Sequence, residues 1–144
     1  CVGGAYPGST QGMNRGTILV AGDCRHEAGL RMRRGTIAIA GSVGAMPGRS
    51  MLAGTILVLG SSGSYPGLGM KRGTLILLGD HPATLPSAFA YDCRGAATIL
   101  RVIQRELQAQ GFPIPSDLLH REIRHYSGDR NELGKGEVFL SAAG

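Results

Sequence analysis

The sequence is poor in aromatic residues and in long apolar runs, and each shortage excludes a class of function. Its 144 residues include no tryptophan, three phenylalanines and four tyrosines. Few aromatic side chains are therefore available to stack on the bases of a nucleic acid. No apolar run approaches the roughly 18 residues that a membrane-spanning helix needs. The first ten residues also lack the basic and apolar regions of a signal peptide. We expect neither nucleic-acid binding nor membrane insertion.

Cysteine is also scarce. Cys1, Cys24 and Cys93 form no even set and no C-x-x-C pair. Secreted domains that depend on disulfides usually carry paired cysteines, whereas this pattern is typical of reduced thiols. We therefore expect a cytoplasmic protein with free thiols.

What the sequence has in excess is glycine, arranged in a repeat of 19 residues. The phrase RGTILVAG at 15–22 returns as RGTIAIAG at 34–41, AGTILVLG at 53–60 and RGTLILLG at 72–79. Methionine and threonine keep the same spacing, at Met13, Met32, Met51 and Met70 and at Thr17, Thr36, Thr55 and Thr74. A fixed period over four copies without insertion is typical of stacked repeat proteins.

Each copy of the phrase predicts a short strand, because residues 17–21 are β-branched and apolar and lie between glycines. If each period is one coil, like residues stack on like at a strand spacing of about 4.8 Å. The alternate positions are apolar too, so we expect protein to cover both faces. Glycines that reach φ > 0 would turn each corner. We predict an all-β solenoid, a right-handed parallel β-helix with 19-residue coils. Antiparallel hairpins remain an alternative, although they do not require this period.

The period breaks after Gly79, and the remaining chain predicts different elements. Residues 94–110 place apolar side chains at helical spacing, and Gly111 ends that helix. A second helix is predicted over 116–126, and a final strand over 137–140.

These patterns divide the chain into parallel β-helix repeats at 1–80 and a C-terminal extension at 81–144. The extension is a short α-helical cap with a final strand, packed over the open end or flank of the solenoid. At the other end, Gly3 is in register with the closing glycines. We therefore expect the chain to start at the end of an earlier coil, covered by a partner or continued by upstream residues.

The net charge of +5 is unevenly distributed. The region 1–80 has eight Lys and Arg against three acids, and 81–144 has seven of each. Much of the excess forms a basic ladder at 19-residue spacing, interrupted at Ala53: Arg15, Arg33, Arg34, Lys71 and Arg72. One interpretation is a solvated edge that blocks strand addition. The other is a docking face for an acidic partner or an anionic cofactor tail.

We predict no catalytic residue, no cofactor-binding residue and no metal ligand in this chain. The histidines show no metal-ligand spacing, at His26, His81, His120 and His125. The three acids of residues 1–80 are too few for the carboxylate cluster of a polysaccharide-cleaving β-helix. Asp23 and Asp80 follow closing glycines and are interpreted as turn residues.

The repeated phrase GxxMxRGTIxVxG resembles a glycine-repeat β-helix found in two families. One is the third subunit of formylmethanofuran dehydrogenase, and the other is the C-terminal domain of glutamate synthase. The tail RHYSGDRNELGKGEVFL at 124–140 is similar to the ending of the dehydrogenase group. It has a Tyr-x-Gly-Asp step followed by Leu-Gly-x-Gly-Glu. Within that group the chain is most similar in pattern to the methylotroph formyltransferase/hydrolase complex.

The resemblance implies a cytoplasmic, non-catalytic scaffold subunit of a complex in tetrahydromethanopterin-linked C1 metabolism. Its partners would be formyltransferase and amidohydrolase-like subunits. The resemblance also implies a methanofuran-like carrier at the level of the complex, whose glutamate-rich tail would meet the basic ladder. By itself the chain would not be an enzyme.

Two other functions stay open at this stage. A glutamate synthase-type domain would brace an amidotransferase, although no histidine or oxyanion partner is found for Cys1 as a nucleophile. A free-standing binding module would use the basic ladder for an acidic ligand. Self-association into a homo-oligomer is also open.

Overall fold

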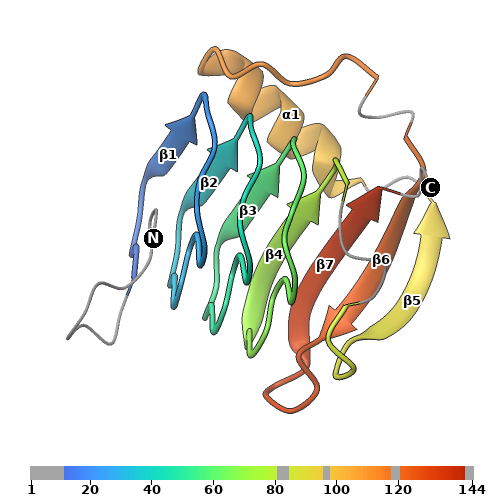
Figure 1. Cartoon of the computed structure of the whole chain (residues 1–144). Helices are drawn as coiled ribbons and strands as arrows, with labels where there is room; N and C mark the ends of the chain where they lie inside the picture. The colour runs from blue at the N-terminus through green and yellow to red at the C-terminus, as the bar shows by residue number, and fades with distance from the viewer. Residues whose placement is uncertain (1–11, 81–84, 96–97, 118–120, 142–144) are drawn as a thin grey trace.

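The computed structural model describes residues 12–80, 85–95, 98–117 and 121–141, which form one mixed seven-stranded sheet and one α-helix (Figure 1). The strands are β1 (Thr17–Val20), β2 (Thr36–Ile39), β3 (Thr55–Val58), β4 (Arg72–Leu77), β5 (Ala90–Gly95), β6 (Ile123–Gly128) and β7 (Lys135–Ser141), and the helix is α1 (Ile99–Ala109). The order across the sheet is β1-β2-β3-β4-β7-β6-β5. The sheet is therefore open, with β1 and β5 at its edges.

The four repeated phrases form the four neighbouring parallel strands β1 to β4. Each residue lies opposite the residue 19 positions later, so Thr17 pairs with Thr36, Ile37 with Ile56 and Val58 with Leu77. The predicted stacking of like residues is confirmed. Register is set by the apolar pattern, because a slip by one residue would turn every buried side chain to the other face.

The predicted right-handed parallel β-helix is wrong, because the described residues form a single open, mixed sheet with a short helix. Only four to six residues of each repeat pair as a strand. The rest turns through left-handed residues, including Glu27, Met46 and Tyr65 at φ 55–59°, which cannot continue an extended strand. Consecutive turns are joined by backbone hydrogen bonds, and Val43 and Ser62 form an isolated bridge between them. The C-terminal strands then make the sheet mixed.

The final strand β7 is a fifth structural copy of the phrase, outside the 19-residue period. It pairs in parallel with β4, so Lys135 lies opposite Arg72 and Gly136 opposite Gly73. The predicted final strand at 137–140 is confirmed and lies within β7. Strand β6 then runs antiparallel between β7 and β5.

Two apolar clusters cover the two faces of the sheet. One lies between the sheet and the turns and includes alternate strand residues with the methionine column: Met32, Ile37, Ile39, Met51, Ile56, Val58, Met70, Leu75, Leu77, Val138 and Leu140. The other lies under α1: Ala38, Leu57, Ile76, Leu78, Leu100, Ile103, Leu107, Phe112, Ile123 and Phe139. Both faces are therefore covered, as the apolar alternate positions predicted.

Of the two helices predicted in the extension, the first is present as α1 and Gly111 ends it at φ +79°. The second, at 116–126, is wrong where the structure describes it. Residues 123–128 form β6, and residues 118–120 lie outside the described residues. Backbone pairing with β5 and β7 on both sides overrides the local helix signal. Strand β5 was not predicted.

The glycines of the phrase have two different roles. Gly35, Gly54 and Gly73 are left-handed at φ 101–105°, as expected for turns. The closing glycines are not left-handed, contrary to the expectation of corners. A Cβ on Gly60 would lie 2.4 Å from the carbonyl oxygen of Gly41. Close contact between repeats therefore requires glycine there.

Candidate functional site

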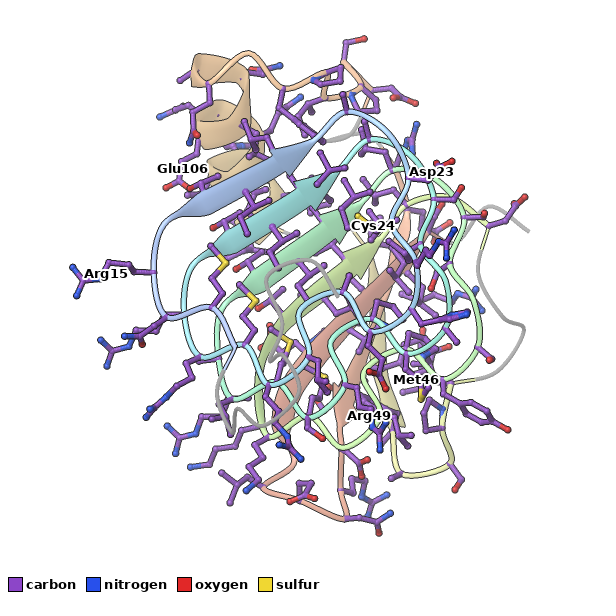
Figure 2. The ribbon with its side chains drawn as sticks, turned by 60° about the vertical axis from the view of Figure 1, so that its left-hand side comes forward. Arg15, Asp23, Cys24, Met46, Arg49 and Glu106 are labelled. Carbon is purple, nitrogen blue, oxygen red and sulfur yellow. The ribbon has the colours of Figure 1, made fainter. Side chains whose placement is uncertain are left out.

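The basic ladder lies along the sheet edge where the repeated strands begin. Arg15 and Arg34 each precede a strand by two residues, and Arg72 opens β4. Because the strands are in register, these side chains form a row, and all five ladder residues are exposed. Figure 2 shows Arg15 projecting away from the sheet, on the side opposite Asp23. The structure thus places the ladder residues on one surface, which we call the basic edge.

Two further cations lie on the basic edge and were not predicted. Lys135 is the pairing partner of Arg72, so it extends the row onto β7. Arg31 lies two residues before Arg33 and is exposed. The signal for Lys135 was the fragment KGEVFL, which has the same pattern as RGTLIL, but it stands outside the period and was interpreted only as a strand.

The basic edge carries little compensating negative charge. The salt bridges of the described residues involve other cations, with Arg49 2.7 Å from Glu27 and Arg121 3.2 Å from Asp117. The carboxylate that reaches this edge is Glu132, from the turn between β6 and β7. The edge therefore presents a positive surface to an approaching ligand.

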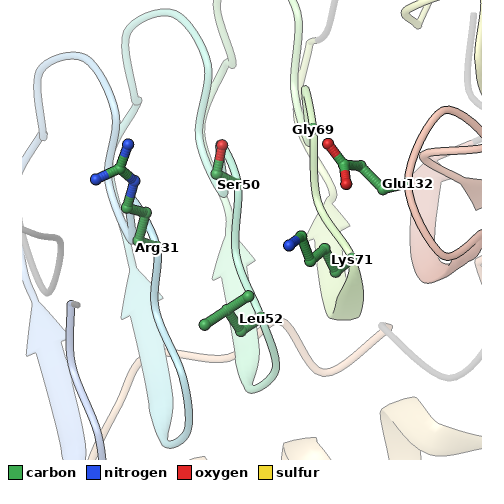
Figure 3. A pocket seen from close by; sticks show the side chains of 6 residues that line it. All are labelled: Arg31, Ser50, Leu52, Gly69, Lys71 and Glu132. Carbon is green, nitrogen blue, oxygen red and sulfur yellow. The ribbon is translucent and has the colours of Figure 1, made fainter. Parts of the chain in front are cut away.

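A pocket of about 380 Å³ opens on the basic edge (Figure 3). It is lined by Arg31, Ser50, Leu52, Gly69, Lys71 and Glu132. These residues come from three repeats and from the β6–β7 turn, so register and tertiary packing together build it. Its walls are charged, and Leu52 contributes an apolar side chain.

A buried carboxylate holds the β6–β7 turn against the fourth repeat. Asp129 is 3% exposed and accepts hydrogen bonds from the backbone N–H of Gly69 at 2.9 Å and of Asn131 at 2.8 Å. Its own backbone N–H donates to the carbonyl of Met70 at 3.1 Å. Asp129 therefore positions the turn that carries Glu132 to the pocket.

A second polar cluster lies on strands β5, β6 and β7. His125 Nδ1 is 3.2 Å from the Asp92 carboxylate, and the His125 ring stacks on Phe139 with centroids 4.7 Å apart. Ser127 donates a hydrogen bond to Asp92 rather than to His125. A serine nucleophile needs its hydroxyl on the histidine, so this Ser, His and Asp set is not arranged as a hydrolytic triad.

At the other ends of the strands, polar side chains cap the following repeat. Asp23 Oδ1 accepts from the Ser42 N–H at 2.7 Å, and His26 Nδ1 accepts from the Ala45 N–H at 2.8 Å. Ser42 Oγ accepts from the Ser61 N–H at 3.0 Å. Each bond joins residues 19 positions apart and satisfies a backbone donor, so these residues serve stacking.

Cys24 lies beside this column, and its reactivity is a testable property. Burial raises the pKa of its thiol, and the Asp23 carboxylate acts in the same direction. We expect iodoacetamide at pH 8 to alkylate Cys24 more slowly in the folded chain than in urea, because the thiolate is the reactive species. The raised pKa also means that its stabilising contribution is present below pH ~8.5 and declines as pH rises through the folded value. Mass spectrometry of the Cys24 peptide gives both rates, and equal rates would contradict the expectation.

The remaining predicted residues divide between the described and the undescribed parts of the chain. Cys1, His81 and His120 lie outside the described residues. Within the part that is described, no group of three or more His, Cys, Asp or Glu side chains is arranged to hold a metal ion. None of the described helices has the length and apolar character needed to cross a membrane.

The chain is similar to a solved structure, that of the formyltransferase/hydrolase complex (FhcABCD) from Methylorubrum extorquens with methylofuran. It matches one chain of that complex at 40% identity with a TM-score of 0.87. The resemblance to this complex is confirmed. The match covers 98% of this chain and 52% of the other, so the present chain spans about half the length of that relative. No protein-family model and no curated protein matches the sequence.

Proposed function

We propose that this chain acts as a non-catalytic scaffold subunit in a formyltransferase/hydrolase complex of tetrahydromethanopterin-linked C1 metabolism. The observation that carries the proposal is the 40% identity with a chain of such a complex over 98% of this sequence. Its partners would be the formyltransferase and the amidohydrolase-like subunits, in the cytoplasm, with a methanofuran-like carrier bound at the level of the complex.

Two features of the structure support a scaffold role for the chain. Its polar side chains are largely used to join repeats, as in the bonds of Asp23 and His26 to the following repeat. The Ser127 hydroxyl is directed to Asp92 and not to His125, which disfavours nucleophilic chemistry at that cluster. In this proposal the catalytic residues belong to the partner subunits.

The basic edge is proposed as the contact surface for an acidic partner surface. Its cations are exposed and, within the described residues, form no ion pair, so their charge is available to a partner. Electrostatic complementarity of this kind accelerates association and sets orientation.

The proposal is tested by affinity purification of the chain from native lysate, followed by mass spectrometry. We expect formyltransferase and hydrolase subunits to co-purify, and formyl transfer to require the assembled complex rather than this chain alone. Recovery of the chain without either subunit would refute the proposal.

Replacing Arg15, Arg34 and Arg72 together by alanine should weaken assembly by about fivefold to a hundredfold at low salt, because each exposed ion pair contributes about 0.2–1 kcal/mol. The defect should shrink as salt rises, since salt screens exposed charges. Analytical ultracentrifugation of reconstituted mixtures measures both effects. Exposed Arg101 and Arg105 on α1 supply a control, because their replacement removes charge from another surface. Equal effects of the two sets would contradict a role specific to the basic edge.

A further inference from the structure

The basic edge is interrupted at one repeat, and the pocket lies at the interruption. Arg31, Arg33 and Arg34 of the second repeat correspond, 19 residues later, to Ser50, Leu52 and Ala53. In the fourth repeat the charge returns at Lys71 and Arg72. We call the uncharged residues Ser50, Leu52 and Ala53 the neutral saddle.

The pocket combines the saddle with cations from both sides. Ser50 and Leu52 lie between Arg31 on one side and Lys71 on the other (Figure 3). The flanking repeats are two strand spacings apart, about 9.6 Å. A ligand in the pocket therefore meets an apolar side chain at its centre and a cation toward each end.

The backbone indicates that the Arg31 side chain is retained despite local strain. Arg31 has φ 55° and Ser50 has φ 54°, a left-handed conformation, and the equivalent Gly69 has φ 73°. Glycine adopts this conformation freely, whereas a side chain there costs about 1–2 kcal/mol. Strained residues of this kind concentrate at functional sites.

Glu132 bounds the same pocket and narrows the choice of ligand. Its carboxylate repels a continuous polyanion at the end near Lys71. It also accepts hydrogen bonds from the backbone N–H groups of an extended peptide. The pocket therefore suits a segment with separated carboxylates better than an unbroken row of them.

We propose that the neutral saddle docks an acidic segment of a partner polypeptide that carries one apolar side chain between carboxylates. The apolar side chain contacts Leu52, and the flanking carboxylates pair with Arg31 and Lys71. The inference rests on the proposed function in so far as the partner is a subunit of the complex. It goes further because it specifies the sequence character of the docked segment.

The test uses the full chain and two fluorescein-labelled peptides, acetyl-Glu-Glu-Leu-Glu-Glu-amide and the same peptide with serine in place of leucine. Fluorescence anisotropy at low salt measures their affinities. We expect the leucine peptide to bind about fivefold more tightly, as partial burial of one leucine side chain predicts. Equal affinities would overturn the proposal.

Two matched variants, Leu52→Arg and Ala53→Arg, separate a fitted site from a general positive surface. Both add one cation at neighbouring positions, but Leu52 lines the pocket and Ala53 does not. We expect Ala53→Arg to strengthen the binding of both peptides. Leu52→Arg should abolish the preference for leucine and weaken the leucine peptide. If the two variants strengthen binding alike, the surface is merely electrostatic and the proposal fails.

Arg31→Gly tests the strained cation without loss of the fold. The binding of the leucine peptide should fall about twofold to fivefold, as the loss of one exposed ion pair predicts. The midpoint of thermal unfolding should stay unchanged or rise, because glycine relieves the left-handed strain at Arg31. Unchanged peptide affinity would contradict the assignment of Arg31.

The peptide measurements use this chain alone, so they separate the docking inference from the proposed function. Leucine preference without co-purifying subunits would refute the complex and leave the saddle intact. Co-purification without leucine preference would refute the saddle and leave the complex intact.

Discussion

Replacing Gly60 by alanine should lower the free energy of unfolding by about 3 kcal/mol. The new Cβ would lie 2.4 Å from the carbonyl oxygen of Gly41 and 2.7 Å from Ser42 Oγ. The obstructing carbonyl belongs to the backbone of the neighbouring repeat, so relief would require the two repeats to move apart. That movement would disturb the packing of β2 against β3. Urea denaturation followed by circular dichroism measures the loss.

The matched control for this substitution is Gly22→Ala. Gly22 occupies the same place in its repeat, and nothing in the structure lies within 4 Å of a Cβ there. Neither glycine is left-handed, so backbone conformation does not distinguish the two. We expect Gly22→Ala to change the free energy of unfolding by less than about 0.5 kcal/mol. Equal losses at the two positions would refute the contact-based explanation.

Replacing Asp129 by alanine should also destabilise the protein, by about 3 kcal/mol. Its carboxylate is buried and accepts the backbone N–H groups of Gly69 and Asn131. Removing the acceptor leaves two donors unsatisfied, at about 1–3 kcal/mol each, and water entering the turn offsets part of this cost. The thermal unfolding midpoint should fall clearly.

Asp117→Ala supplies the comparison, because Asp117 is an exposed carboxylate paired with Arg121 four residues later. Such a pair contributes about 0.3–0.5 kcal/mol, so its loss should barely move the midpoint. Asp129→Ala should also lower the leucine preference at the saddle, since Asp129 positions the turn that carries Glu132. A midpoint shift no larger than that of Asp117→Ala would show that Asp129 is not a structural anchor.

The repeated strands were predictable because their information is local and periodic. Thr17, Ile18 and Val20 have the β-branched character of a strand, and the 19-residue period specifies their partners directly. The helix α1 was predictable for the same kind of reason, since its apolar residues recur at helical spacing.

The strands β5 and β6 were not predictable from the same evidence. Residues 123–128 mix Ile123 with charged and polar side chains, and their extended conformation depends on neighbours on both sides. The chain between the repeats also has no pattern that distinguishes three sheets around a coil from one open sheet. The left-handed residues Glu27, Met46 and Tyr65 decide that question, and none of them is a glycine that marks such a conformation in a sequence.

The basic edge divides in the same way between sequence and structure. The positions of Arg15, Arg34 and Arg72 at one edge follow from the period, because in-register parallel strands carry equivalent residues to the same place. The addition of Lys135 and Glu132 does not follow from it, because both come from the C-terminal segment that pairs with β4.

The sequence by itself therefore determined the strand register, the helix α1, the cationic row and the resemblance to the formyltransferase/hydrolase complex. Each of these depends on residue type at a regular spacing or on a contiguous motif. Only the tertiary structure decided that the sheet is open and mixed, that β7 continues the row, and that a pocket lies at the interruption of that row. Those features depend on pairing between segments distant in the chain, and no local pattern encodes such pairing.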